Sequence, residues 1–117
     1  MKITIVSRDP PLGLRMEGQL TVKEIADADR QLEEALVPAG FRQKAVLDLA
    51  NVGFIDSSGI SWLMICHKHF AQAGGKIVFH SAPELIQQTL HLLRLDLVLN
   101  LAEDENAARA MALEARK

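Results

Sequence analysis

Features that would point to several classes of protein are scarce in this sequence of 117 residues. Cys66 is the only cysteine, so no disulfide can form within the chain, and a lone thiol fits a reducing compartment, which makes the cytoplasm the expected location. No apolar run approaches the ~20 residues that a membrane span needs, and the N-terminus has no apolar stretch of signal-peptide length. We therefore expect no direct membrane insertion.

An excess of basic residues is also missing. The chain has 13 Lys and Arg against 15 Asp and Glu, a formal net charge of −2, so it lacks the positive field that attracts phosphate backbones, and no nucleic acid partner is expected. Hydrophobic residues make up 49% and charged residues 24%, which is ordinary for a soluble folded chain. Repeats and linkers of distinct composition are absent, so residues 1–117 are expected to form a single domain.

Short periodic segments, separated by single Pro and Gly residues, predict alternating strands and helices. Thr21 and Glu24 form a capping-box pattern, and Asp104 is a good cap for a final helix that ends at Arg116. The other expected helices are 22–36, 58–73 and 83–93, and the expected strands are 2–6, 12–17, 45–49, 76–80 and 97–101. The first two strands are expected to form a hairpin, and residues 50–56 a loop.

This order of elements predicts an α/β fold. Each strand-helix-strand unit joins strands by a right-handed crossover, so about four helices should cover a mixed sheet of about five strands. Such a layout hosts many functions, and the function must be argued from a site.

The junction before the second helix reads Asp56, Ser57, Ser58, Gly59. Ser and Asp are good N-cap residues, so the simplest interpretation is a helix cap. However, one side chain is enough to cap a helix, which leaves at least one hydroxyl here free to face solvent. A helix N-terminus carries a partial positive charge and free amides that can hold a phosphoryl group, although Asp56 opposes it.

At this point the sequence resembles the STAS family of anti-sigma factor antagonists, over nearly the whole chain. The resemblance is carried by the residues around the serine pair, by glycines that flank the strands and helices, and by one buried strand. These are Gly18, Leu20, Val46 to Leu49, Phe54 to Ile60, Gly74, Gly75, Pro83 and Leu95. The resemblance implies a single STAS-like domain.

It further implies a phosphorylatable regulatory binding protein. By resemblance Ser57 is the phosphate acceptor, the partners are an anti-sigma factor with serine kinase activity and a phosphatase, and the unmodified protein binds the kinase until phosphorylation releases it. The chain itself would be no enzyme. The sequence departs from the usual pattern at Ser61 and Trp62, which are candidate partner-binding residues. The alternative is a non-catalytic STAS subunit of a transporter or signalling scaffold, without a phosphorylation cycle.

Other sites receive little support from the residue pattern. Cys66, His67 and His69 do not share one helical face and fall short of a zinc ligand set, so no metal is expected. No Gly-x-Ser-x-Gly elbow surrounds Ser57 or Ser58, and the Gly75-containing turn lacks the pattern of a phosphate-binding loop. We therefore expect no catalytic residues and no cofactor.

Trp62 is the single tryptophan and has two interpretations. Tryptophan is largely buried on average, so Trp62 could pack against the sheet or the first helix. Tryptophan is also enriched at binding hot spots, so it could instead anchor a partner beside Ser57.

Overall fold

The computed structural model of the chain describes residues 1–114. The strands are β1 (Lys2–Ser7), β2 (Leu12–Leu20), β3 (Lys44–Ile55), β4 (Lys76–His80) and β5 (Leu101–Ala102). The α-helices are α1 (Ile25–Leu36), α2 (Ser57–Gln72), α3 (Glu84–Leu92) and α4 (Glu105–Leu113). Short 3-10 turns are η1 (Val22–Glu24), η2 (Gly40–Arg42) and η3 (Leu95–Leu97).

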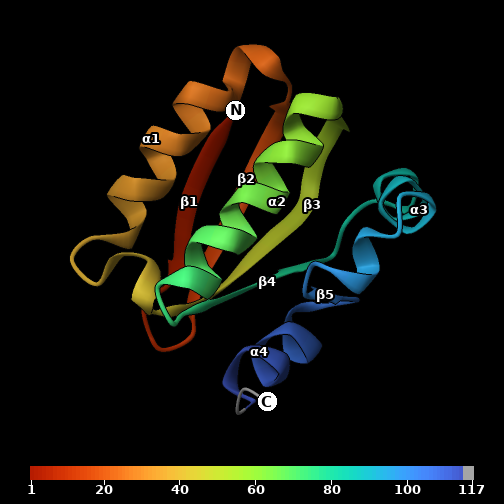
Figure 1. Ribbon diagram of the computed structural model, residues 1–117. Helices are drawn as coiled ribbons and strands as arrows, with labels where there is room; N and C mark the ends of the chain where they lie inside the picture. Colours follow the sequence, from red (N-terminus) through yellow and green to blue (C-terminus); the bar gives the residue numbers. More distant parts are fainter. Residues whose placement is uncertain (115–117) are drawn as a thin grey trace.

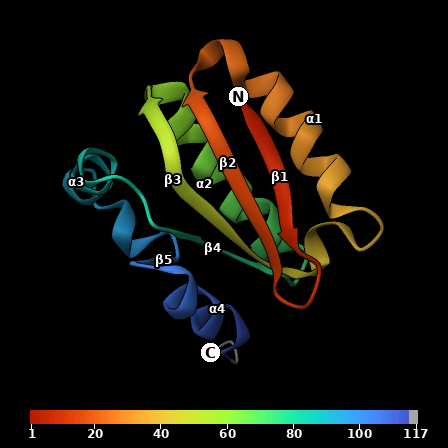
Figure 2. The same cartoon turned by 180° about the vertical axis from the view of Figure 1, so that it is seen from behind.

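The five strands form one mixed sheet in the order β1-β2-β3-β4-β5. The hairpin β1-β2 is antiparallel, and the pairs β2-β3, β3-β4 and β4-β5 are parallel. Figures 1 and 2 show the sheet with β1 at one side and the short β5 at the other. The α/β class and the mixed sheet of five strands with four helices are thereby confirmed.

Helices cover the two faces of the sheet unequally. Helices α1 and α2 lie side by side on one face, as Figure 1 shows, and bury the main core with the side chains of β3 that alternate toward them, such as Leu47 and Leu49. Val46 and Val78 point to the opposite face, where Ala108 and Ala112 of α4 cover them. The chain thus has a large core under α1 and α2 and a small one under α4.

Strand β3 is longer than the sequence predicted. It runs through residues 50–55, where a loop was expected, and there it pairs with β2 alone, since β4 pairs only with residues 44–48. Ala50, Asn51 and Phe54 are exposed along this part and only Val52 is fully buried. The sequence of a strand that has one neighbouring strand and little burial resembles that of a loop, because it lacks the apolar run of a central strand.

The predicted strand at residues 97–101 is wrong. A 3-10 turn (η3) occupies residues 95–97, and β5 consists only of Leu101 and Ala102. Arg94 has a left-handed backbone (φ 59°) just after α3, and in the turn that follows, Leu97 and Val98 are exposed while Leu95 and Leu99 are buried. A short apolar run does not distinguish a strand from other apolar segments by periodicity alone.

The helices differ from their expected limits by a few residues. Pro83 is the N-cap of α3, and Asp104 caps α4 by accepting a hydrogen bond from the Ala107 amide at 2.8 Å. Helix α4 ends at Leu113, and the expected helix end at Arg116 lies outside the described residues. The buried face of α2 includes Trp62 and Cys66, whereas Met64 is exposed.

Candidate functional site

The serine pair lies at one edge of the sheet. The carboxyl ends of β2 and β3 meet there with η1, which leads into α1, and with the first turn of α2, as the upper part of Figure 1 shows. Ser57 is the first residue of α2 and is exposed. Its hydroxyl makes no hydrogen bond to any described residue, so it is free to react or to contact a partner.

Asp56 is the residue that caps α2. Its Oδ1 accepts a hydrogen bond from the Gly59 amide at 2.9 Å, and its backbone is extended, as is usual for an N-cap. Its Oδ2 accepts a second hydrogen bond, from the Val22 amide at 3.1 Å. One carboxylate therefore ties the start of α2 to the start of η1, which is 34 residues away in sequence.

These hydrogen bonds also hold the Asp56 carboxyl in its charged form. The Gly59 amide contributes most to lowering the pKa of Asp56 below its ordinary value, and the Val22 and Ser58 amides lower it further, while partial burial opposes them. Asp56 is therefore an anion at neutral pH. A phosphoryl group on Ser57 would have to be accommodated next to this fixed negative charge.

The Thr21-Glu24 pair does not form the predicted capping box. The Thr21 side chain makes no hydrogen bond to the backbone of η1, and its hydroxyl contacts the Glu24 carboxylate instead. The Val22 amide that a local cap would leave open is bound by Asp56. Because this bond joins distant parts of the chain, the local sequence pattern does not reveal it.

Gly59 is required by a close approach of α2 to the end of β2. A Cβ at this position would lie 2.2 Å from the Leu20 carbonyl oxygen and 2.5 Å from Cγ1 of Ile55. The same Leu20 carbonyl accepts a hydrogen bond from the Asp56 amide at 3.3 Å. Gly59 thus lets the helix start close against the sheet edge.

Ser58 does not cap α2, because Asp56 occupies that role. Ser58 is partly buried, whereas Ser61 is exposed one turn after Ser57 along α2. Asp56, Ser57, Ser58 and Gly59 thus lie together at the start of α2, and Ser61 is one turn further along the helix.

Trp62 packs in the core. Its side chain is 3% exposed, and its indole N–H donates a hydrogen bond to Oδ1 of Asp29 at 2.6 Å. Trp62 is therefore buried and packs against the first helix, α1, as in the first of the two interpretations. Trp62 therefore holds α2 against α1 and presents little surface to a partner.

Two exposed apolar residues beside the site were not recognised in the sequence. Val22, expected as the first residue of the first helix, is 67% exposed, and its amide donates a hydrogen bond to Asp56. Phe54, expected in a loop, is 52% exposed two residues before Asp56. Both side chains are therefore open to contact with another molecule.

The cysteine and histidines of α2 do not form a metal centre. Burial raises the pKa of the Cys66 thiol to about 12, which disfavours the thiolate that binds metals. Within residues 1–114 no three His, Cys, Asp or Glu side chains are placed to share an ion. Among the same residues, no helix is both long enough and apolar enough to cross a bilayer.

Comparison with known proteins identifies this architecture. The family described as "Mlab, STAS domain" matches residues 3–103. The chain therefore belongs to the STAS-domain family.

Solved structures of anti-sigma factor antagonists share the fold. A candidate anti-sigma factor antagonist of Thermotoga maritima superposes with a TM-score of 0.78 at 18% identity, covering 97% of this chain and 94% of its own. An anti-sigma factor antagonist (STAS) domain protein of Planctomyces limnophilus superposes with a TM-score of 0.78 at 18% identity, covering 96% of this chain and 98% of its own. The Bacillus cell fate determinant SpoIIAA in its phosphorylated form superposes with a TM-score of 0.64 at 14% identity, covering 94% of this chain and 97% of its own.

Proposed function

We propose that this chain is a regulatory binding protein whose affinity for a partner is set by phosphorylation of Ser57. In its unmodified form it binds an anti-sigma factor that is also a serine kinase. Phosphorylation of Ser57 ends that binding, and a phosphatase restores it. The chain acts in the cytoplasm and catalyses no reaction itself.

The observation that carries this proposal is that Asp56 caps α2 and leaves the Ser57 hydroxyl without a structural role. Asp56 binds the amides of Gly59 and Val22, so the helix start is complete without either serine. The Ser57 hydroxyl is exposed and uncommitted to any described residue, at a helix N-terminus that accepts negative charge. Modification there changes the surface without dismantling the fold.

The charge of the modification supplies the switch. A phosphoryl group adds roughly −1.5 to −2 charge at neutral pH, beside the anionic Asp56 and the apolar Val22 and Phe54. A partner that covers this surface would have to desolvate that charge, which costs several kcal/mol when it is unpaired. A loss of about 3 kcal/mol weakens a complex more than a hundredfold.

Labelling with a purified partner kinase and radiolabelled ATP tests the proposal. We expect wild type and Ser58→Ala to incorporate phosphate, and Ser57→Ala to incorporate none. Ser57→Asp should keep the wild-type melting temperature but bind the kinase about a hundredfold more weakly, whereas Ser57→Ala should bind the kinase with the wild-type Kd. Label entering Ser57→Ala as readily as wild type would refute the assignment of Ser57.

A second candidate function is a permanent, non-catalytic subunit of a transporter or signalling scaffold. The description of the matching family, "Mlab, STAS domain", does not mention sigma-factor regulation, and this supports the alternative. In that case Ser57 would be a contact residue, and Ser57→Asp would still weaken the complex. Phosphopeptide mapping of the protein from its native cell separates the two, because only the switch predicts a phosphorylated fraction at Ser57.

A further inference from the structure

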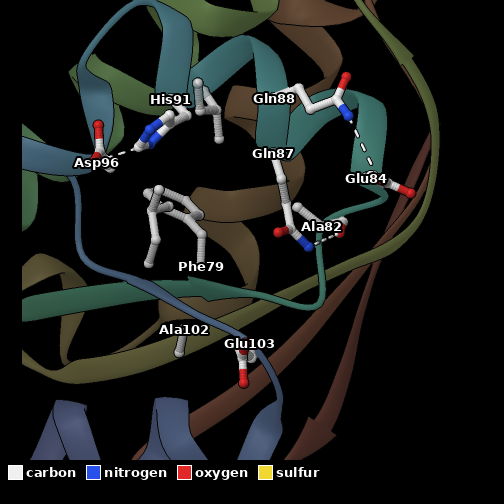
Figure 3. Close-up of a pocket in the computed structure, with 11 residues that line it drawn as sticks. Phe79, Ala82, Glu84, Gln87, Gln88, His91, Asp96, Ala102 and Glu103 are labelled. Carbon is white, nitrogen blue, oxygen red and sulfur yellow. Dashed lines mark hydrogen bonds and ion pairs between the residues drawn. The ribbon is translucent and has the colours of Figure 1, made fainter.

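A pocket of about 440 Å³ lies between β4, α3 and β5. Figure 3 shows the Phe79 side chain within it, with α3 above and the chain after β5 below. Phe79, Leu90 and Leu101 supply most of its apolar lining, and its volume is in the range of pockets that bind a ligand or an anchoring side chain. None of its lining residues belongs to the Ser57 site.

The polar rim of this pocket is acidic. Glu84, Asp96 and Glu103 line it, and Nδ1 of His91 lies 3.3 Å from Oδ2 of Asp96. Among residues 1–114, no Lys or Arg lines the pocket; Arg94, the basic residue nearest in sequence, is not one of its lining residues. The rim therefore suits a positively charged ligand group.

The two glutamines of the rim add hydrogen-bond acceptors. Nε2 of Gln87 donates to the Ala82 carbonyl at 2.7 Å, and Nε2 of Gln88 lies 3.4 Å from Oε1 of Glu84, as the dashed lines in Figure 3 show. Their carbonyl oxygens make no hydrogen bond to other described residues. Such oxygens can accept from ammonium or guanidinium groups.

The helix and turn that border the pocket expose an unusual amount of apolar surface. In the 14 residues from 85 to 98, five large apolar side chains are at least half exposed, namely Leu85, Leu92, Leu93, Leu97 and Val98. Leu92 and Leu97 are the most exposed, at 82% and 75%. All five lie on α3 or in the turn that follows it, and exposed apolar residues concentrated in one segment favour an interaction surface, whereas scattered ones do not.

We propose that α3, η3 and this pocket bind an amphipathic helix of a partner protein that carries Lys or Arg beside its apolar stripe. Apolar side chains of that helix enter the pocket over Phe79 and cover Leu92 and Leu97, while its basic side chains meet Glu84, Asp96 and Glu103. A small molecule confined to the pocket would leave the exposed leucines in water. An anionic membrane surface would meet the acidic rim with like charge.

This surface is separate from the proposed switch. It is built from β4, α3, η3 and β5, whereas the Ser57 site is built from β2, η1, β3 and α2. Phosphorylation of Ser57 therefore leaves it unchanged, and the chain can hold one partner here while it exchanges another at Ser57. Each proposal can fail without the other.

Titration of the ¹⁵N-labelled chain with a synthetic helical peptide of Leu and Lys tests the inference. The matched probe is a Leu and Glu peptide with identical spacing. We expect the Leu-Lys peptide to shift the amides of α3, η3 and β5 to saturation, and the Leu-Glu peptide to bind at least tenfold more weakly. The double variant Leu92→Ser, Leu97→Ser should bind the Leu-Lys peptide at least tenfold more weakly than wild type does. Its fold should be intact, because both side chains are exposed and their replacement spares the core.

Two control variants accompany this pair. Leu113→Ser removes an exposed leucine from α4 and should bind as wild type does, and so should Ser57→Asp. The inference is overturned if the shifts map to α1 and α2, if the double variant keeps the wild-type Kd, or if both peptides bind equally. It is also overturned if vesicles of anionic lipid bind this surface and the Leu-Lys peptide does not, or if the chain pairs with itself through these leucines and excludes the peptide.

Discussion

Single residues at the Ser57 site are constrained for different physical reasons. Gly59 is required by space, since its missing side chain leaves room for the Leu20 carbonyl. Asp56 is required by two backbone amides that need an acceptor. Ser57 itself meets no such requirement, which is why its hydroxyl is available for chemistry or contact.

Gly59→Ala should destabilise the protein, although Gly to Ala inside a helix ordinarily stabilises it by about 1 kcal/mol. The new Cβ would lie 2.2 Å from a backbone oxygen, and overpacking of this kind costs roughly 1–3 kcal/mol. Urea unfolding measures the loss. The control is Gly53→Ala, where a Cβ would have no neighbour within 4 Å; an equal loss in both variants would contradict the steric account.

Trp62→Ala should lower stability by about 3–5 kcal/mol, the usual cost of truncating a buried aromatic side chain. The structure motivates this because Trp62 is 3% exposed and its indole bonds to Asp29. Ile65→Ala, on the exposed side of the same helix, is the matched control and should change stability little. A variant of Trp62 that melts normally yet fails to bind a partner would instead support the interface-anchor interpretation.

Among the elements, the two helix starts at the site depend on each other. Asp56 caps α2 and also binds the first amide of η1, whereas Asp104 caps only α4. Removing the Asp56 carboxylate therefore loosens two elements that meet at the Ser57 surface, and the effect should extend to the contact surface as well as to stability.

The stability contributed by Asp56 should depend on pH. Its pKa is lowered in the folded protein, mainly by the Gly59 amide, so folding favours the anion. The advantage of wild type over Asp56→Ala should be complete above the ordinary Asp pKa of 3.8, and should fade as the pH falls through the lowered folded value. Unfolding of both proteins by urea from pH 7 down to acid pH measures this.

Asp104→Ala controls for the loss of a single helix cap. Near neutral pH it should cost about 1 kcal/mol, as is usual for an N-cap aspartate, and should leave the amide signals of the Ser57 site unchanged. Asp56→Ala should shift the signals of both η1 and the start of α2. If only α2 responds, the link between the two elements is not significant in solution.

At the scale of the whole molecule, α1 and α2 cover one face of the sheet and carry most of the core. On the other face, α4 covers only the part formed by β3, β4 and β5, and it packs there with small residues, while Figure 2 shows no helix of residues 1–114 over β1 and β2 on that face. Ala108 and Ala112 let that helix lie close to Val46 and Val78. Close packing of this kind tolerates little added volume.

Ala108→Leu should therefore destabilise the protein by about 1–3 kcal/mol, because it forces α4 away from the sheet. Ala108 is fully buried, whereas Ala110 on the same helix is exposed, so Ala110→Leu is the control and should change stability little. Thermal unfolding of both variants measures the difference. Equal melting temperatures would show that α4 does not pack on the sheet as described.

The sequence alone determined the class of fold and pointed to Ser57, at the start of α2, as the candidate site. Periodicity and helix-cap residues predicted the four α-helices and the strands β1 to β4 of residues 1–114, because these signals act over a few neighbouring residues. They failed where burial is partial, as in the second half of β3, and where an apolar run stays in water, as at Leu97 and Val98.

Only the tertiary structure decided which side chains do what at the site. The bond from Asp56 to the Val22 amide, the pairing of Trp62 with Asp29, and the lack of space at Gly59 all join residues from distant parts of the chain. No local pattern encodes such contacts, since they arise when separate elements pack together. The exposed leucines of α3 and η3 likewise became a surface only when the fold left them uncovered.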